Sequence, residues 1–583
     1  MSFYLGTNSH RSATSTWLAG VLVALSSNTQ AQTAPANDAA RQGQIIELQQ
    51  RERLRDLQER ALPQPAAPQG ADLKDLRPKI ALPKVEGGCH DIKALHIEGA
   101  TLLNEADRTD FTRAYTGRCL GAEDIQNLLA ALTKNYIDRG YVTTRVYLPQ
   151  QDLSIGTLTL RVVEGTIERY EVKQKGRPGD NLWVRGAFPP NPGDILNLRA
   201  LEQGQEQANS LPSNHTTIDL VPGTEPGQSV VVVTNQAQRP EHLQVVYDNL
   251  GSDSTGRHNL AATGSLDGVL GFNELISYTH SQTIPRNSAH EAHADALHFA
   301  LPYGYNTFSL DASRSTYDNA LTLPSGQVAL STGPSTRYTA GVSRVIERSQ
   351  TSLTSLFGQL NITDSKNYLD GELLSTNSRK LASFTVGASR YMQVLGGALN
   401  GKLAYERGIA AFGALHDSPD VPGAYPHAQF DKLALDLNYQ HLVSLGPVKL
   451  QWNSQLSGQY AGQTLFGTEQ FLIGSASTVR GFRMSSLSGD NGVLFRNDLA
   501  WPWSITVGDN PIRGTVYGGF DAGRVGDHAS GASFAGSMTS ATIGATAQWH
   551  GASAELFVSR ALHRPVFLIN EGTVVGFRLS YSL

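Results

Sequence analysis

The most informative shortages in this sequence are of long apolar runs and of positive charge. Its single long apolar run, Trp17–Leu25, is about half the length that a membrane-spanning helix requires. The net charge of −5 and the pI near 6.4 argue against a nucleic-acid partner, because phosphate binding needs a basic face. An apolar content of 40% and a mean hydropathy of −0.26 are typical of soluble proteins. Both values also fit a membrane β-barrel, because its strands are apolar on only one face.

Cysteine is almost absent as well. Cys89 and Cys119 are the two cysteines of the 583-residue chain. Two thiols without suitably spaced histidines make a poor zinc site, so we expect no metal. In an oxidising compartment, pairing of the two thiols would contribute roughly 3–4 kcal/mol on the chain-entropy model. We therefore expect a disulfide between them.

The sequence also lacks the signatures of common enzymes. It contains neither a G-x-S-x-G elbow nor a G-x-x-x-x-G-K-[ST] phosphate loop. The run from His290 to His293 resembles H-E-x-x-H, but the second histidine comes one residue early and Ala294 holds the required position. The two imidazoles would not share a helix face as zinc needs, and with His298 they predict a polar hairpin loop. We expect no catalytic residue and no cofactor.

Residues 1–31 are typical of a secretory signal peptide. Arg11 precedes the apolar run, and small residues stand at the third and last positions before Gln32, where we predict cleavage. The alternative is a buried N-terminal helix. Export without a spanning helix leaves two destinations, a soluble periplasmic or secreted protein and an outer-membrane barrel.

Residues 32–62 predict a highly charged helix. Glu47 and Arg51 are four residues apart and would support a solvated helix. The apolar positions are sparse for a helix that packs into a core. They are Ile45, Leu48, Leu54 and Leu57. A solvent-exposed or disordered leader is the alternative. The prolines of residues 63–88 predict a semi-extended linker.

Residues 89–165 and 166–238 each predict a compact α+β unit. The first predicts strands and helices at Ile92–Ile97, Glu105–Tyr115, Ala122–Arg139, Tyr141–Leu148 and Ser154–Val163. The second predicts them at Thr166–Val172, Asp180–Ala187, Leu198–Leu211, Thr216–Val221 and Ser229–Asn235. The run Val230–Val233 is too continuously apolar for an exposed edge, so we expect the last strand to be central in its sheet.

Residues 239–583 predict an all-β transmembrane barrel. In the clearest stretch, apolar residues from Leu433 to Tyr439 alternate with polar or small ones from Lys432 to Gln440. One apolar and one polar face is what a lipid-facing barrel with a polar lumen requires. At roughly 20 residues for each tilted strand and its connection, this part of the chain predicts about 16 antiparallel strands. A soluble sandwich or propeller is the alternative, but we find no blade repeat.

Two short motifs interrupt this alternation. The first suits neither a helix interior nor an alternating strand, and it comprises Val479, Arg480, Gly481 and Phe482. A glycine beside a guanidinium lets the backbone turn tightly while the planar fork reaches a carboxylate. The second motif places an aspartate among small residues of a predicted strand, and it comprises Phe520, Asp521 and Gly523.

Together the two motifs resemble the pair found in outer-membrane polypeptide transporters with POTRA domains, a VRGF/Y loop tip folded into a barrel and an F-x-D-x-G strand on its inner wall. The order of helix, linker, two α+β units and barrel is similar to that of the TpsB transporters of two-partner secretion, the FhaC and ShlB type. The resemblance implies two POTRA domains (89–165 and 166–238), a helix that plugs the lumen, and an inward-folded loop around residues 465–492. It makes Arg480 the loop-tip cation and Asp521 its wall partner. The alternative is that these two residues never meet.

The resemblance further implies a Gram-negative outer-membrane pore that exports a large β-helical exoprotein without ATP. The expected partners are that exoprotein, bound through POTRA domains in the periplasm, and outer-membrane lipid, and the pore would be monomeric. In the implied sequence of steps, the POTRA units capture an extended secretion signal, the helix leaves the pore, and the substrate passes the pinned loop. The alternative within the superfamily is a barrel-assembly factor, which would carry more POTRA units and no N-terminal helix. A passive porin would lack POTRA units altogether.

Overall fold

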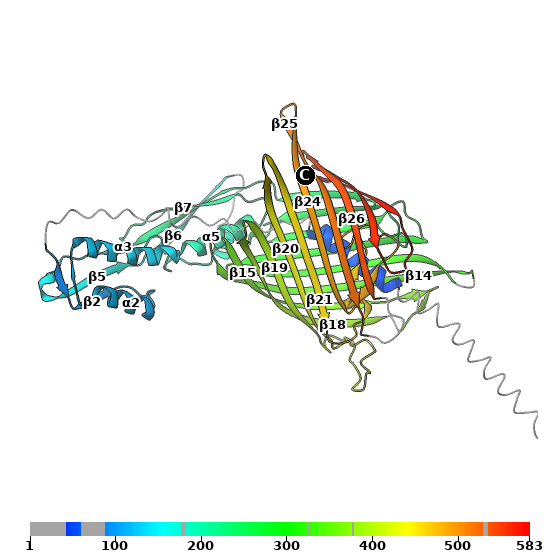
Figure 1. The fold of residues 1–583 in the computed structure, drawn as a ribbon, viewed down its shortest axis with the longest axis horizontal. Helices are drawn as coiled ribbons and strands as arrows, with labels where there is room; N and C mark the ends of the chain where they lie inside the picture. Colours follow the sequence, from blue (N-terminus) through cyan, green and yellow to red (C-terminus); the bar gives the residue numbers. More distant parts are fainter. Residues whose placement is uncertain (1–41, 60–87, 176–181, 324–325, 376–377, 529–534) are drawn as a thin grey trace, which may run out of the picture.

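The computed structural model describes residues 42–59, 88–175, 182–323, 326–375, 378–528 and 535–583. The expected signal peptide (1–31) and all but the last residue of the expected linker (63–88) lie outside these ranges. An arm of two small α+β units leads into a large closed barrel (Figure 1). Within the described ranges, no helix is both long and apolar enough to cross a membrane.

The first α+β unit follows the predicted order of helices and strands, with differences at several strands. Its elements are β1 (His90–Ile92), β2 (Ala94–Glu98), α2 (Glu105–Tyr115), β3 (Arg118–Leu120), α3 (Ala122–Asp138), β4 (Arg145–Tyr147) and β5 (Thr157–Val163). The strand expected to begin at Tyr141 begins only at Arg145, because the backbone N–H groups of Tyr141 and Thr144 close turns onto Tyr136 and Tyr141. The short strand β3 was not expected, and it pairs with β1.

The expected disulfide between Cys89 and Cys119 is present, with 5.2 Å between the two Cα atoms. It lies beside the β1–β3 pair, in which Asp91 is in register with Cys119. This two-stranded sheet has no hydrogen-bonded partner in the rest of the unit, and isolated strand pairs are marginal in water. The covalent bond therefore holds an edge of the unit that backbone pairing alone would hold weakly.

The second unit contains β6 (Thr166–Lys175), α4 (Leu182–Ala187), α5 (Leu198–Asn209), β7 (Thr216–Pro222) and β8 (Gln228–Gln236). Its sheet order is β6-β8-β7, so β8 is central, as the continuous valine run predicts. Val231 and Val233 are fully buried in the core of this unit.

The two units share side chains at their junction. Ile137, in the last turn of α3, is buried in the core of the second unit together with Val142. The Asn197 side chain caps α5 by accepting from the backbone of Arg199 at 2.9 Å, and it donates to the carbonyl of Arg139 at 3.0 Å. Because one helix contributes to both cores, the junction is a packed interface and not a free linker.

A buried tyrosine strengthens the same region. The Tyr136 hydroxyl donates to Glu164 at 2.9 Å, and Glu164 also accepts from the backbone of Leu102 at 2.9 Å. Burial and this hydrogen bond to Glu164 raise the pKa of Tyr136, so it remains a neutral donor. Its carboxylate partner ties α3 to the segment that follows β5.

The second unit also contacts the barrel. Arg348, at the end of a barrel strand, donates to Gln203 on α5 at 3.0 Å and pairs with Glu206. The backbone N–H of Gly304 in a barrel turn donates to the carbonyl of Gly186 at 2.6 Å. The arm is thus fixed to the barrel by side-chain and main-chain contacts.

Sixteen long antiparallel strands close the barrel in the part of the chain that the structure describes. They are β9 (Glu241–Asp248), β10 (Asn259–Asp267), β11 (Leu275–Thr283), β12 (His290–Tyr303), β13 (Asn306–Thr322), β14 (Val328–Arg348), β15 (Ser352–Ser365), β18 (Arg379–Val394), β19 (Gly397–Gly408), β20 (Asp431–Leu445), β21 (Val448–Ala461), β24 (Asn491–Val507), β25 (Asn510–Gly526), β26 (Gly536–Trp549), β27 (Ala552–His563) and β28 (Thr573–Ser582). The first and last of them pair, with Asp248 in register with Arg578. A small hairpin of β16 (Tyr368–Leu369) and β17 (Glu372–Leu373) is added at one end. Closure leaves no open sheet edge around the wall.

The predicted loop around the histidines is wrong. His290, His293 and His298 all lie in strand β12. The alternation of β12 places Ala292, Ala294 and Ala296 toward the lumen, and His293 falls on the other face, where it hydrogen-bonds Thr316 at 2.8 Å. Three polar residues in a short window resemble a loop, but a barrel strand can carry polar residues on either face.

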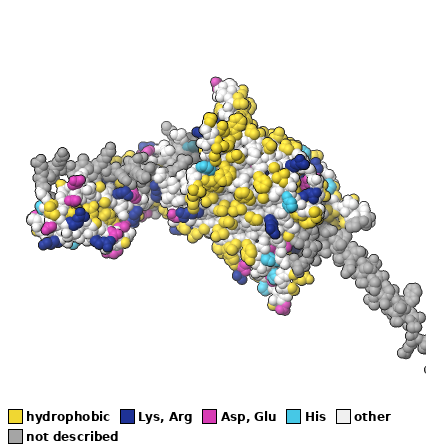
Figure 2. Space-filling view, in the orientation of Figure 1, with side chains coloured by type: hydrophobic (Ala, Val, Ile, Leu, Met, Phe, Trp, Pro, Cys, Tyr) yellow, Lys and Arg dark blue, Asp and Glu magenta, His cyan; other side chains and the backbone are white. Residues whose placement is uncertain are grey.

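The outer wall of the barrel is apolar. Figure 2 shows hydrophobic side chains gathered over the barrel strands, in contrast to the more charged arm. Exposed apolar residues come from strands all around the wall. They include Leu243, Leu297, Leu310, Val342, Phe384, Leu403, Leu433, Phe495, Ile543 and Leu556. Such an area of exposed apolar surface is stable only against lipid.

Replacing both cysteines by serine (Cys89→Ser with Cys119→Ser) should lower the unfolding free energy of the first unit by about 3–4 kcal/mol, because the unfolded loop is no longer constrained. Pulse proteolysis of the full-length protein across a urea series would measure the loss. Reductant should destabilise the wild type to the level of the double variant and leave the variant unchanged. Equal midpoints for all samples would contradict the role assigned to this bond.

Candidate functional site in the barrel lumen

The segment between β21 and β24, residues 462–490, folds into the barrel and is named here the lumen loop. It contains a single helical turn (Gly467–Glu469) and a small hairpin of β22 (Phe471–Ile473) and β23 (Leu487–Gly489). Its tip carries the Val479–Phe482 motif.

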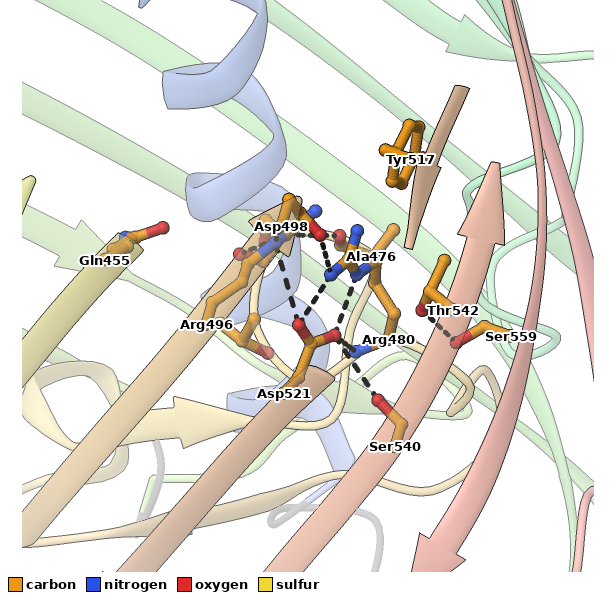
Figure 3. A network of polar contacts seen from close by, with 12 residues as sticks. Gln455, Ala476, Arg480, Arg496, Asp498, Tyr517, Asp521, Ser540, Thr542 and Ser559 are labelled. Atoms are coloured by element: carbon orange, nitrogen blue, oxygen red, sulfur yellow. Dashed lines mark hydrogen bonds and ion pairs between the residues drawn. The ribbon is translucent and has the colours of Figure 1, made fainter. Parts of the chain in front are cut away.

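Arg480 at the loop tip is held by two wall carboxylates (Figure 3). Its Nε donates to Asp521 Oδ2 at 2.7 Å and its Nη2 to Asp521 Oδ1 at 2.7 Å, which makes a bidentate pair. The same Nη2 donates to Asp498 at 2.6 Å, and the backbone N–H of Arg480 donates to Asp521 at 3.0 Å. Arg480 and Asp521, which come from segments far apart in sequence, therefore meet. The exposed fractions of their side chains are 1% and 0%.

The surroundings of this pair balance its charge. Arg496 lies 3.8 Å from Asp498 and 3.9 Å from Asp521, so two guanidinium groups face two carboxylates. Arg496 also donates to the carbonyls of the loop residues Ala476 and Ser477 at 3.2 and 3.3 Å. Removal of either Arg480 or Asp521 would leave the other, almost fully buried, without its bidentate partner, which costs about 3–5 kcal/mol.

Two glycines of the motifs are required by close approach. Gly481 has φ of 89°, in the left-handed region that favours glycine. On β25, a Cβ atom at Gly523 would lie 2.9 Å from side-chain carbons of both Ile473 and Val479. The second glycine thus makes room on the wall for the apolar side of the loop.

The loop tip is also anchored by apolar packing. Val479 and Phe482 are buried in a cluster with Ile473, Leu494 and Met538, among others. Phe520, which the sequence pattern groups with the wall partners of the loop, is placed otherwise. It lies on the opposite face of β25 with 46% exposure, because successive residues of a strand point to opposite faces.

Several residues that hold the loop could not be identified from the sequence. Glu571, in the β27–β28 connection, accepts from three successive backbone N–H groups, those of residues 483–485, at 2.6 to 2.8 Å. At the loop base, Lys432 Nζ lies 2.6 Å from Glu469 and 3.2 Å from Glu406. These residues carry no motif, because carboxylates and lysines on lumen-facing positions are common in barrels.

A helix of residues 42–59 lies inside the barrel and is named here the lumen helix (Figure 1). Its apolar side chains are buried against small wall residues, Ile46 against Ala292 and Leu54 against Ala294 and Ala296. A Cβ atom at Gly43 would lie 2.3 Å from the Tyr317 hydroxyl, so this glycine allows a close approach to the wall. The thin apolar stripe suffices because alanines line the facing wall.

Charged groups of the lumen helix bind the seam where the barrel closes. Arg53 Nη2 donates to both oxygens of the buried Asp248 on β9 at 3.1 Å. Arg578 on β28 donates to Asp56 of the helix at 2.7 Å and lies 3.8 Å from Asp248. These four residues, named here the seam clasp, join the helix to the first and last strands. At its other end the helix accepts hydrogen bonds at Glu47 from the hydroxyls of two wall serines.

The lumen helix and lumen loop face one another across a cavity of about 510 Å³. Most of its lining comes from the helix, the loop tip and the wall strands that hold them. The loop also touches the helix directly, since a Cβ atom at Gly467 would lie 2.1 Å from Gln44 Oε1. Both elements therefore obstruct the same channel.

Comparison with known proteins identifies the family that shares this architecture. Residues 227–547 match the family model of the haemolysin secretion/activation proteins ShlB/FhaC/HecB, residues 90–165 match the POTRA domain of ShlB type, and residues 166–222 match a further POTRA domain. The chain belongs to the ShlB/FhaC/HecB family. The predicted family is therefore confirmed.

Individual relatives agree with this assignment. The outer membrane transporter CdiB of Dickeya dadantii is 34% identical over 85% of this chain and 87% of its own. The hemolysin transporter protein ShlB of Serratia marcescens is 34% identical over 89% of this chain and 87% of its own. Among solved structures, CdiB from Escherichia coli superimposes with a TM-score of 0.81 at 29% identity, covering 93% of this chain and 98% of that one. The predicted fold class and the outer-membrane location, with POTRA domains in the periplasm, are confirmed.

Replacing Asp248 by asparagine should loosen the lumen helix, because Arg53 and Arg578 would face each other without the anion between them. A hydrogen bond to a charged group contributes about 1.5–3 kcal/mol, so openings of the channel in planar bilayers should become about tenfold more frequent or more. Asp253→Asn, which affects an exposed ion pair with Arg257 in the β9–β10 loop, is the matched control. Unchanged opening of the Asp248 variant, in a barrel that remains heat-modifiable, would show that the seam clasp does not hold the helix.

Proposed function

We propose that this protein exports a large exoprotein in an unfolded state across the outer membrane by two-partner secretion. The observation that carries the proposal is a barrel whose lumen is closed by two elements of its own chain, attached to two POTRA units. A porin would not need the POTRA units, and a channel that stayed closed by its own helix would carry nothing. The lumen helix is therefore the element that leaves, and the lumen loop is the element that remains.

The contacts that hold each element support the proposal that the lumen helix leaves and the lumen loop remains. The lumen helix contacts the wall through small apolar clusters and a few polar contacts. The lumen loop is bound by a fully buried bidentate ion pair, three successive backbone hydrogen bonds to Glu571 and a larger apolar cluster. Val479, Arg480, Gly481 and Phe482 would keep the loop tip on the wall as the substrate passes, with Asp521 and Gly523 as the wall side of that attachment.

The first POTRA unit offers a place for an extended substrate segment. Its sheet order is β2-β5-β4, so β4 is an edge strand. Exposed apolar side chains lie on β4 and on its connection to β5. They are Tyr147, Leu148 and Ile155. An unpaired edge with apolar neighbours suits strand addition by an unfolded polypeptide, and we assign the entering secretion signal to this edge.

The finer parts of the proposal rest on the likeness to the relatives, among them a CdiB transporter and a hemolysin transporter. The exported protein would be a β-helical adhesin, haemolysin or contact-dependent toxin, and its folding outside the cell would drive transport. The pore would act as a monomer and without catalysis. The barrel-assembly alternative predicts more POTRA units and no N-terminal helix, whereas the described residues contain two such units and the lumen helix.

The test is secretion of the cognate exoprotein by cells carrying Arg480→Ala. Secretion should fall by about tenfold or more, because the variant leaves the fully buried Asp521 without its bidentate partner, at a cost of about 3–5 kcal/mol. Arg480→Lys keeps the charge but not the bidentate geometry, so it should fall between the alanine variant and the wild type. Barrel abundance and heat-modifiability are assayed in parallel.

Arg524→Ala is the matched control, because Arg524 lies on the same strand as Asp521 but is exposed on the other face. Lost secretion from a folded Arg480 variant, with the control intact, supports the transporter. Normal secretion would show that Arg480 is not needed for transport. Failed assembly of unrelated barrels would favour the barrel-assembly alternative.

A further inference from the structure

Strands β24 and β25 extend past both of their neighbours. Strand β21 pairs with β24 only as far as Ala500, and β26 pairs with β25 only from Arg513 onward. Residues 501–504 therefore pair only with β25, and residues 505–512 pair only with one another; residues 501–512 are named here the projecting hairpin. Figure 1 shows its tip, labelled β25, rising beyond the wall of the barrel.

The projecting hairpin lies at the periplasmic end of the barrel. The β12–β13 turn at Gly304 contacts the second POTRA unit. In the antiparallel order of the wall, β12 and β24 run in the same direction, so the turns that follow them lie at the same end. The hairpin thus starts where the lipid-facing wall meets the periplasmic side.

The two faces of the hairpin differ in polarity. On β24, apolar residues alternate with proline and hydroxyl residues, the apolar ones being Trp501, Trp503, Ile505 and Val507. Trp501 and Ile505 are 56% and 59% exposed, and Ile505 is in register with Ile512 on β25. The opposite face carries Ser504, in register with Arg513. By strand alternation, the apolar face continues the outward line of Phe495 and Leu499 on the same strand.

The adjacent hairpin of β20 and β21 projects in the same way. Strand β19 pairs with β20 no further along the chain than Gln440. Strand β24 pairs with β21 only from Gln451 onward. Its outward positions include Leu445 and Val448, both exposed. The apolar surface is therefore two hairpins wide and continuous with the lipid-facing wall.

The free edges of the projecting hairpin are unsuited to a polypeptide partner. Pro502 lies on β24 and Pro511 on β25, each where the strand has one neighbour only. Proline lacks the N–H group that strand addition uses and is a common device that blocks edges. Tryptophan beside aliphatic residues is instead typical of the membrane–water interface.

We propose that the projecting hairpin lies on the periplasmic leaflet of the outer membrane, with its apolar face against phospholipid and its polar face in water. It anchors the barrel at a fixed depth on the side of β20–β25. The occupant of this surface is lipid because the surface continues the established lipid-facing wall and because its edges are blocked. This inference does not depend on which protein is exported.

The test uses nitroxide labels at Ile505→Cys and Ser504→Cys in the full-length protein, reconstituted in phosphatidylethanolamine–phosphatidylglycerol vesicles. Both native cysteines are in the disulfide, so the new thiol is the only one to react. Collision with oxygen reports lipid, and collision with a water-soluble nickel chelate reports water. The oxygen-to-nickel ratio at residue 505 should exceed that at residue 504 severalfold and approach that of a Leu499→Cys reference on the lipid-facing wall.

Ile512→Cys labels the same face from the other strand and should repeat the result at residue 505, so a misfolded single variant cannot decide the matter. Heat-modifiability selects the folded samples. Equal nickel access at residues 504 and 505 would place the hairpin in water and overturn the proposal. Protection of residue 505 from both reagents would indicate a protein partner and would overturn it as well.

Discussion

The organisation of the lumen depends on one buried guanidinium. Arg480 is almost fully excluded from solvent and binds Asp521 through two parallel hydrogen bonds. Burial of a charge is tolerated only when it is paired with an opposite charge, and this requirement fixes the position of β25, the loop tip and Asp498 relative to one another. The apolar cluster around Val479 and the glycine at residue 523 follow from that fixed distance, because the loop must lie flat on the wall for the fork to reach its carboxylate.

The lumen helix is held by different interactions. Its charged residues meet the seam of the barrel, where Asp248 and Arg578 already face each other across the first and last strands. Departure of the helix would leave these two in place as partners, so the wall has a stable arrangement with and without it. Asp521 also has a wall partner, Arg496 at 3.9 Å, but movement of the loop tip would remove its bidentate pair and the backbone hydrogen bond from Arg480.

Much of this architecture could be predicted from residues alone, and the failures have identifiable causes. The alternation around Leu435 and the repeated α+β pattern indicated the barrel and its arm, because both depend on local periodicity. The pairing of Arg480 with Asp521 was accessible through two motifs. Glu571 and Arg496 were not, because single charged residues at alternate strand positions look like any lumen-facing residue. Phe520 lies on the face opposite to the expected one, since the face of a strand is set by register and not by a residue's neighbours in sequence. The β12 histidines lie in a strand and not in the expected loop, because several polar residues close together resemble a loop.

The shared core between the two POTRA units has a mechanical consequence. Ile137 of α3 is buried in the second unit, and Arg348 binds that unit to the barrel. The periplasmic arm therefore has a fixed length. The edge strand β4 is held at a set distance from the channel entrance. An extended chain covers at most about 3.3–3.6 Å per residue, so on the proposed function the arm sets a minimum length for an unfolded segment that is bound at β4 and enters the pore.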